Sequence, residues 1–189
     1  MKNTFVYQTE KSIIKLLQIT DPHLFKEKET ALLGVNTQAS FTQVLKEIQQ
    51  ENNTFDIILA TGDLVQDGSD EGYRRFVEMV TPLNKPIFWI PGNHDFQPKM
   101  VEHLNKTPIE SAKHLLLGKY WQALLLDSQV YGVPHGQLSQ HQLNLLEEKL
   151  AQHPNRYTLV VLHHHLLPTN SAWLDQHNLR NSHELAEVL

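Results

Sequence analysis

Cysteine is absent from the 189 residues of the sequence. Disulfide bonds, thiolate nucleophiles and zinc sites built on thiolates are therefore excluded. No apolar run approaches the roughly 20 residues that a membrane helix needs. Residues 1–5 hold one lysine and no apolar signal-peptide region. These absences predict a cytoplasmic protein that has no membrane as a partner.

Basic residues are fewer than acidic residues. Sixteen lysines and arginines stand against 21 acidic residues, so the formal net charge is -5. Long polyanions are held mainly by Lys and Arg contacts to phosphates, and the composition therefore argues against a nucleic acid polymer as a partner. A small phosphate ester that binds through metal ions is compatible with this charge.

Histidine is the residue type in excess, with 12 copies in a chain whose hydrophobic content is an ordinary 40%. Typical domains hold about 100–200 residues and bury a sizeable core at that length. We therefore expect residues 1–189 to form a single domain.

Short apolar runs alternate with amphipathic segments along the chain. The runs have the length and composition of buried strands, and they cover residues 13–19, 55–60, 87–90, 121–126 and 158–162. Apolar residues recur at helical spacing in residues 41–48 and 73–80, which predicts two helices that each bury one face.

Two further helices are predicted from their first residues. Ser139 with Gln142, and Asn181 with Glu184, have the spacing of capping boxes. Residues 115–128 could form an antiparallel hairpin. The alternation of strands and helices predicts an α/β protein, with a mixed β-sheet sandwich flanked by helices.

Acidic, imidazole or amide side chains follow four of the predicted strands. In α/β sheets, functional sites lie beyond the carboxyl ends of the strands. Oxygen and nitrogen ligands without sulfur suit divalent iron, manganese or zinc, so we prefer a metal site to an acid-base site. The four blocks are Asp21-Pro22-His23, Gly62-Asp63, Gly92-Asn93-His94-Asp95 and His163-His164-His165.

Each block also has a purely structural alternative. On an extended backbone Asp21 and His23 would point the same way, but an Asx-type turn would equally explain the pair. Gly62 with Asp63 is a common turn sequence. The run that contains Asn93 is harder to explain as structural, because it joins an amide, an imidazole and a carboxylate. Three consecutive histidines cannot all face one point on a strand, so at most two should be functional.

The four blocks, in this order and spacing, resemble the calcineurin-like metallophosphoesterases from about residue 15 to the end of the chain. Within that family the chain is similar to the bacterial class III 3′,5′-cyclic-AMP phosphodiesterases. The resemblance implies a four-layer αββα fold, two divalent metal ions, and hydrolysis of cyclic AMP to 5′-AMP by a metal-bridging hydroxide. The segments that carry the closer similarity are Leu126-Asp127-Ser128, Gly132-Val133-Pro134-His135-Gly136 and Trp173-Leu174-Asp175-Gln176-His177.

The resemblance also implies a role for each ligand. Asp21 and His23 would bind one metal ion, Asp63 would bridge both ions, and Asn93 with His164 would bind the second. Iron and manganese are favoured over zinc. His164 is chosen because relatives often show His-His-Pro with the first His as ligand, and residue 166 occupies the Pro position here.

His94 is implied to face the phosphate as a catalytic residue rather than to bind metal. Many relatives orient this His with an Asp three residues after the bridging Asp, but this chain has Gln66 there. Asp67 is the nearest substitute, and we predict it as the second catalytic residue.

The family also has a Gly-His-x-His motif that supplies one ligand to each metal. No such motif follows His165, because His177 and His183 lack its glycine and spacing. We therefore expect the C-terminal part to be missing, which could leave this chain inactive by itself. The alternatives are a phosphoesterase for another small diester or monoester, and an inactive metal-binding scaffold. A homodimer is compatible with the sequence.

Overall fold

The computed structural model describes residues 4–50, 54–106 and 108–189. Contacts between residues divide the chain into two compact units. The central unit is Ile13–Ser111, and the terminal unit combines Met1–Ser12 with Ala112–Leu189. Each unit has its own sheet and is described by itself. The single domain expected for residues 1–189 stays a prediction.

The sheet of the central unit has four parallel strands in the order β2-β5-β6-β7. Three of them confirm predicted strands, and β5 is buried along its whole length, as expected for a parallel strand covered on both faces. The fourth has only two residues. The strands are β2 (Leu16–Ile19), β5 (Ile57–Ala60), β6 (Ile87–Trp89) and β7 (Ile109–Glu110).

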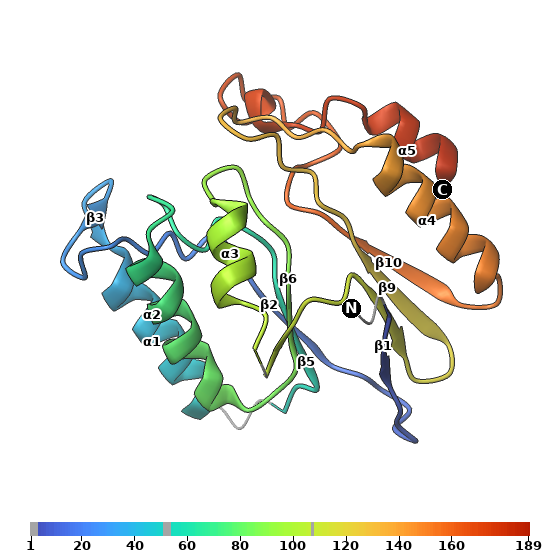
Figure 1. The fold of residues 1–189 in the computed structure, drawn as a ribbon, viewed down its shortest axis with the longest axis horizontal. Coiled ribbons are helices and arrows are strands. Elements are labelled where there is room, and N and C mark those ends of the chain that lie inside the picture. The colour runs from blue at the N-terminus through green and yellow to red at the C-terminus, as the bar shows by residue number, and fades with distance from the viewer. Residues whose placement is uncertain (1–3, 51–53, 107) are drawn as a thin grey trace. The chain divides into compact units, whose positions relative to one another are not determined.

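Helices pack on this sheet through the apolar stripes that the sequence predicts. Phe41 of α1 (Thr37–Gln50) stacks on Phe76 of α2 (Asp70–Val80), with 6.0 Å between ring centroids, and the two helices run side by side in Figure 1. Their buried residues form one core with Ile58 and Trp89 of the sheet. The unit also contains α3 (Gln97–His103), the turn η1 (Thr81–Leu83) and the hairpin β3 (Ala31–Leu32) to β4 (Val35–Asn36).

The sheet of the terminal unit is mixed, in the order β1-β8-β9-β10. Strands β8 and β9 pair antiparallel, which confirms the predicted hairpin, whereas β1 pairs parallel to β8 and β10 parallel to β9. The strands are β1 (Thr4–Tyr7), β8 (His114–Leu117), β9 (Trp121–Leu125) and β10 (Tyr157–Val161).

Two predicted helices, α4 (Gln140–Gln152) and α5 (Ser182–Val188), cover this sheet, and η2 (Leu174–His177) precedes α5. Ser139 caps α4 by accepting the backbone N–H of Gln142, but the Gln142 side chain accepts from Asp127 N instead of completing the capping box. Asn181 stands at the N-cap position of α5, as predicted, and its Nδ2 donates to Glu184 Oε2 at 2.9 Å, but its side chain makes no capping hydrogen bond to the helix backbone. It accepts instead from the backbone N–H of Leu138 and donates to the Leu138 carbonyl.

The fold class is confirmed as α/β, with parallel and mixed sheets flanked by helices. The stacking of four layers in the order αββα stays a prediction. Within the described residues, none of the helices has both the length and the apolar character needed to cross a lipid bilayer.

Candidate metal centre

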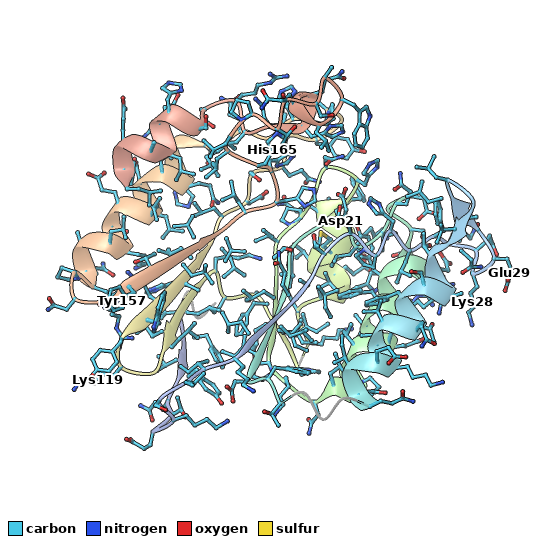
Figure 2. All side chains as sticks on the ribbon, turned by 180° about the vertical axis from the view of Figure 1, so that it is seen from behind. Asp21, Lys28, Glu29, Lys119, Tyr157 and His165 are labelled. Carbon is cyan, nitrogen blue, oxygen red and sulfur yellow. The ribbon has the colours of Figure 1, made fainter. Side chains whose placement is uncertain are left out.

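The strands β2, β5 and β6 run parallel, so their carboxyl ends meet at one edge of the central sheet. Asp21, labelled in Figure 2, lies in the loop after β2, Asp63 lies in the loop after β5, and Asn93 lies in the loop after β6. The first two loops stay side by side beyond the sheet. The backbone N–H of Asp21 donates to Gly62 O at 3.0 Å, and that of His23 donates to Asp63 O at 3.0 Å.

Three of the candidate ligands have a left-handed backbone. The φ angles are 54° at Asp21, 44° at His23 and 51° at Asp63. Residues other than glycine rarely adopt this conformation. It is found most often at functional sites, where the surrounding structure enforces it. The extended backbone expected for the Asp21 to His23 segment is therefore wrong. The side chains of Asp21 and His23 are instead oriented by the left-handed backbone of the loop after β2.

Asp21, His23 and Asp63 converge on one point. Each offers a ligand atom, and these atoms lie within 4.8 Å of one another. His23 Nε2 lies 3.4 Å from Asp21 Oδ1 and 3.8 Å from Asp63 Oδ2. Two carboxylates and one imidazole are ligands that divalent iron, manganese and zinc accept. The donor set therefore fits the metal that the sequence predicts.

The electrostatics of the cluster favour positive charge. Burial by itself would lower the pKa of His23, but the Asp21 carboxylate, the negative charge of Asp63 and the Gln66 side chain together raise that pKa above 6.5. Asp63 is only 3% exposed, so its charge is poorly screened by solvent. A bound cation would compensate these two carboxylates.

Asp63 touches the loop after β6 as well. Its Oδ1 accepts the backbone N–H of His94 at 2.8 Å. A Cβ atom on Gly92 would lie 2.1 Å from Asp63 Oδ1 and 2.4 Å from Asp63 N, so only glycine permits this close approach. Asn93 lies between these two contacts and is half-buried.

The Asp95 carboxylate links the loop after β5 to the loop after β6. It is 1% exposed and accepts hydrogen bonds from the backbone N–H groups of Leu64, Val65 and Gly92 and from the Tyr73 hydroxyl. Burial raises the pKa of Asp95 to about 6, although these donors favour the charged form. The sequence shows that residue 95 is acidic. It does not show that this carboxylate links two loops, because the hydrogen-bond partners lie far away in the sequence.

His94 is exposed, and its ring centroid lies 5.3 Å from that of His23. Gln66 Nε2 donates to His94 Nδ1 at 2.9 Å. The Asp67 carboxylate accepts instead from the backbone N–H groups of Lys26, at 2.8 Å, and Ser69, at 3.2 Å. Gln66 thus takes the place beside His94 that the sequence assigned to Asp67, and a catalytic role of Asp67 stays a prediction.

His164 belongs to the terminal unit, in the loop after β10. It is 3% exposed, and its Nδ1 lies 2.7 Å from the Ser128 hydroxyl oxygen. A Cβ atom on Gly136 would lie 2.4 Å from the His164 ring, so this glycine lets the ring pack against the backbone. With Nδ1 held in this way, a cation would bind at Nε2. Sequence reasoning missed the Ser128 contact.

The two neighbouring histidines have different surroundings. His163 meets the His164 ring edge-on, with 5.1 Å between centroids. His165, labelled in Figure 2, has its Nε2 3.6 Å from Asp175 Oδ1. The choice of His164 as ligand stays a prediction that its fixed ring supports.

Residues 14–187 match the family described as calcineurin-like phosphoesterase. The 3′,5′-cyclic adenosine monophosphate phosphodiesterase CpdA of Haemophilus influenzae is 82% identical over 189 residues, which are 100% of this chain and 69% of the relative. The protein of the same name from Escherichia coli strain K12 is 54% identical over 176 residues, which are 93% of this chain and 64% of the relative.

The solved structure of TT1561 from Thermus thermophilus has a similar fold, with a TM-score of 0.50 and 13% identity. The similarity covers 93% of this chain and 76% of that one. The chain spans about two thirds of the length of the two curated relatives. The matched residues and these identities carry one conclusion: the chain belongs to the calcineurin-like phosphoesterase family.

Proposed function

We propose that the protein hydrolyses 3′,5′-cyclic AMP to 5′-AMP with the help of two divalent metal ions. The observation that carries the proposal is the convergence of Asp21, His23 and Asp63, whose ligand atoms lie within 4.8 Å of one another at the carboxyl edge of the central sheet. The relatives named as cyclic-AMP phosphodiesterases, 82% and 54% identical, support the choice of substrate.

Asp21, His23 and Asp63 would hold the first ion, and Asn93 with His164 would complete the second set, with iron or manganese favoured. When bound, such cations compensate phosphate charge and lower the pKa of water to near neutrality. The protein contributes rigid ligands. Asp63 is fixed by the His94 N–H, and His164 is fixed by Ser128.

Three observations support the proposal that His94 contacts the substrate. Its ring is exposed at the carboxyl edge of the sheet, beside His23, and its Nδ1 is held by Gln66. Its Nε2 would donate a hydrogen bond to the phosphate and pass a proton to the leaving 3′-oxygen. General acids of this kind contribute about 10²–10⁴-fold to the rate.

The test is His94→Ala in a form extended to the length of the relatives. We expect turnover of cyclic AMP to fall by about 10²–10⁴-fold, while metal content measured by plasma mass spectrometry is unchanged. His183, which is exposed on α5, provides the control variant His183→Ala, with full activity expected. Full turnover by His94→Ala would remove His94 from the mechanism.

A phosphoesterase for another small ester is the second candidate, because these ligands handle the phosphate and not the leaving group. Rates with cyclic AMP, cyclic GMP, a chromogenic diester and its monoester separate the two. A metal-binding scaffold would turn over none of them. The cytoplasmic location and the homodimer stay predictions, and sedimentation velocity tests the latter.

A further inference from the structure

Gln66 lies in the loop after β5, three residues beyond Asp63. Its backbone N–H donates to Leu24 O at 2.8 Å, so the residue is anchored to the loop after β2. Its side chain is half-buried and reaches the site, where Nε2 donates to His94 Nδ1 at 2.9 Å. The NH₂ group of the Gln66 amide is therefore paired with His94.

The other end of the amide has a complementary neighbour. Gln66 Oε1 and His23 Nδ1 are both buried without a hydrogen-bond partner within the described part of the chain. Both groups lie beside the same residue, because Gln66 Nε2 donates to His94 Nδ1 and the His23 ring centroid lies 5.3 Å from that of His94. A buried polar atom that lacks a hydrogen bond destabilises the fold. A hydrogen bond from Nδ1 of His23 to Oε1 of Gln66 would satisfy both buried atoms.

We propose that the Gln66 amide sets the hydrogen-bonding roles of both imidazoles at once, by accepting from His23 Nδ1 and donating to His94 Nδ1. The inference rests on the proposed function, since it assigns each ring a role in the same reaction. With its proton on Nδ1, His23 presents the lone pair of Nε2 to a cation between Asp21 and Asp63. With Nδ1 accepting, His94 keeps its proton on Nε2, where a phosphate ester would accept it.

An amide and a carboxylate differ at this position. A carboxylate can only accept, so it would draw the His94 proton to Nδ1 and leave a neutral ring without a donor at Nε2. An amide has an acceptor and a donor at opposite ends. Gln66 can therefore serve His23 and His94 in opposite senses, which makes it a positioning residue for both.

Two variants of Gln66 distinguish its hydrogen bond to His23 from its hydrogen bond to His94. Gln66→Met keeps the length of the side chain and removes both hydrogen bonds, whereas Gln66→Glu keeps an acceptor for His23 and removes the donor to His94. Gln38, a glutamine on α1 whose Oε1 is also buried and unpaired, gives the control Gln38→Met. All variants are compared with the unmodified chain by circular dichroism.

The first readout is Zn²⁺ affinity, measured by competition with a chelator. Loss of such an outer partner costs about 10–100-fold in metal affinity. We expect that loss in Gln66→Met and none in Gln66→Glu or Gln38→Met. Affinity in Gln66→Met equal to that of the unmodified protein would overturn the His23 half of the proposal.

The second readout is the proton position in the His94 ring, from ¹⁵N shifts of the Zn²⁺-loaded protein at a pH where the ring is neutral. We expect the proton on Nε2 in the unmodified protein and on Nδ1 in Gln66→Glu. A proton on Nδ1 in the unmodified protein overturns the His94 half, even if a variant does not fold. Absent turnover of cyclic AMP by the form extended to the length of the relatives, with both readouts as expected, would instead refute the proposed function.

Discussion

The two oxygens of the Asp63 carboxylate serve different neighbours, because Oδ1 accepts the His94 N–H and Oδ2 lies 3.8 Å from His23 Nε2. Asp63→Asn keeps an acceptor for His94 but removes the negative charge. We expect it to lose metal binding while the fold stays near its original stability, whereas Asp63→Ala should lose both. Calorimetric metal titration and urea unfolding measure the two effects. Tight binding of two ions by Asp63→Asn would contradict the bridging role.

Gly92 sets the distance between the loops after β5 and β6. In Gly92→Ala the new methyl group would meet Asp63 Oδ1 at 2.1 Å, so either the carboxylate or the loop must move. We expect a loss of about 1–3 kcal/mol in the free energy of unfolding, as for other overpacked sites, and weaker metal binding.

Gly34 supplies the control, because it has φ +84° and nothing within 4 Å of its absent Cβ. Gly34→Ala should cost about 1 kcal/mol from backbone strain alone and leave metal affinity unchanged. Equal metal affinity in the two alanine variants would show that Gly92 does not position Asp63.

Residue types at strand ends were enough to predict Asp21, His23 and Asp63 as neighbours, because parallel strands bring their carboxyl ends together. The link that Asp95 makes between two loops and the Gln66 contact with His94 were not predictable, because each joins residues about 30 positions apart through side-chain rotamers. The left-handed backbone at the ligands carried no signal either, since Asp and His are not specific for it.

At the scale of elements, Ser139 begins α4 by accepting the Gln142 N–H through its hydroxyl. Ser139→Ala should lower the free energy of unfolding by about 1 kcal/mol, the usual value of an N-cap. Ser139→Asp should preserve it, because aspartate accepts the same bond and also favours a helix N-terminus. Urea denaturation gives both values, and an unchanged midpoint in the alanine variant would rule out the cap.

Asp70 joins the start of α2 to α3, since its Oδ1 lies 2.8 Å from both His103 Nε2 and Lys99 Nζ. These partners lower the pKa of Asp70 to about 2. The contact therefore stabilises the fold above the ordinary aspartate pKa, near 4, and is lost as pH falls toward 2. Carboxyl NMR should give this low midpoint, and His103→Gln with Lys99→Met should return it to about 4. A midpoint near 4 in the unmodified protein would disprove the contact.

Most elements with an apolar pattern or a cap sequence were predicted from the sequence, but β7 and α3 were not. The helices α1 and α2 and the strands β5 and β9 follow from apolar spacing. Strands of two residues, such as β7, are too short to show a period, and α3 has seven residues. The capping function of Asn181 failed because Leu138, far away in the sequence, competes for its side chain.

For the whole molecule, metal binding should appear as stability. An ion that binds only the folded chain, present at 100 times its Kd, adds about 2.7 kcal/mol. We expect Zn²⁺ or Mn²⁺ to raise Tm and EDTA to reverse the rise, with little response in Asp63→Asn. Scanning calorimetry measures the change, and the same shift in both proteins would indicate binding elsewhere.

The pairing of Thr4 with His114, the first register pair between β1 and β8, joins positions 110 residues apart. A ribosome makes β1 first, yet its hydrogen-bonding partner emerges only after the whole central unit has been synthesised. The central unit can therefore fold around its own sheet before β1 has a strand to pair with. Such a non-local contact closes slowly, so the terminal sheet should gain protection from proteases later than the central sheet.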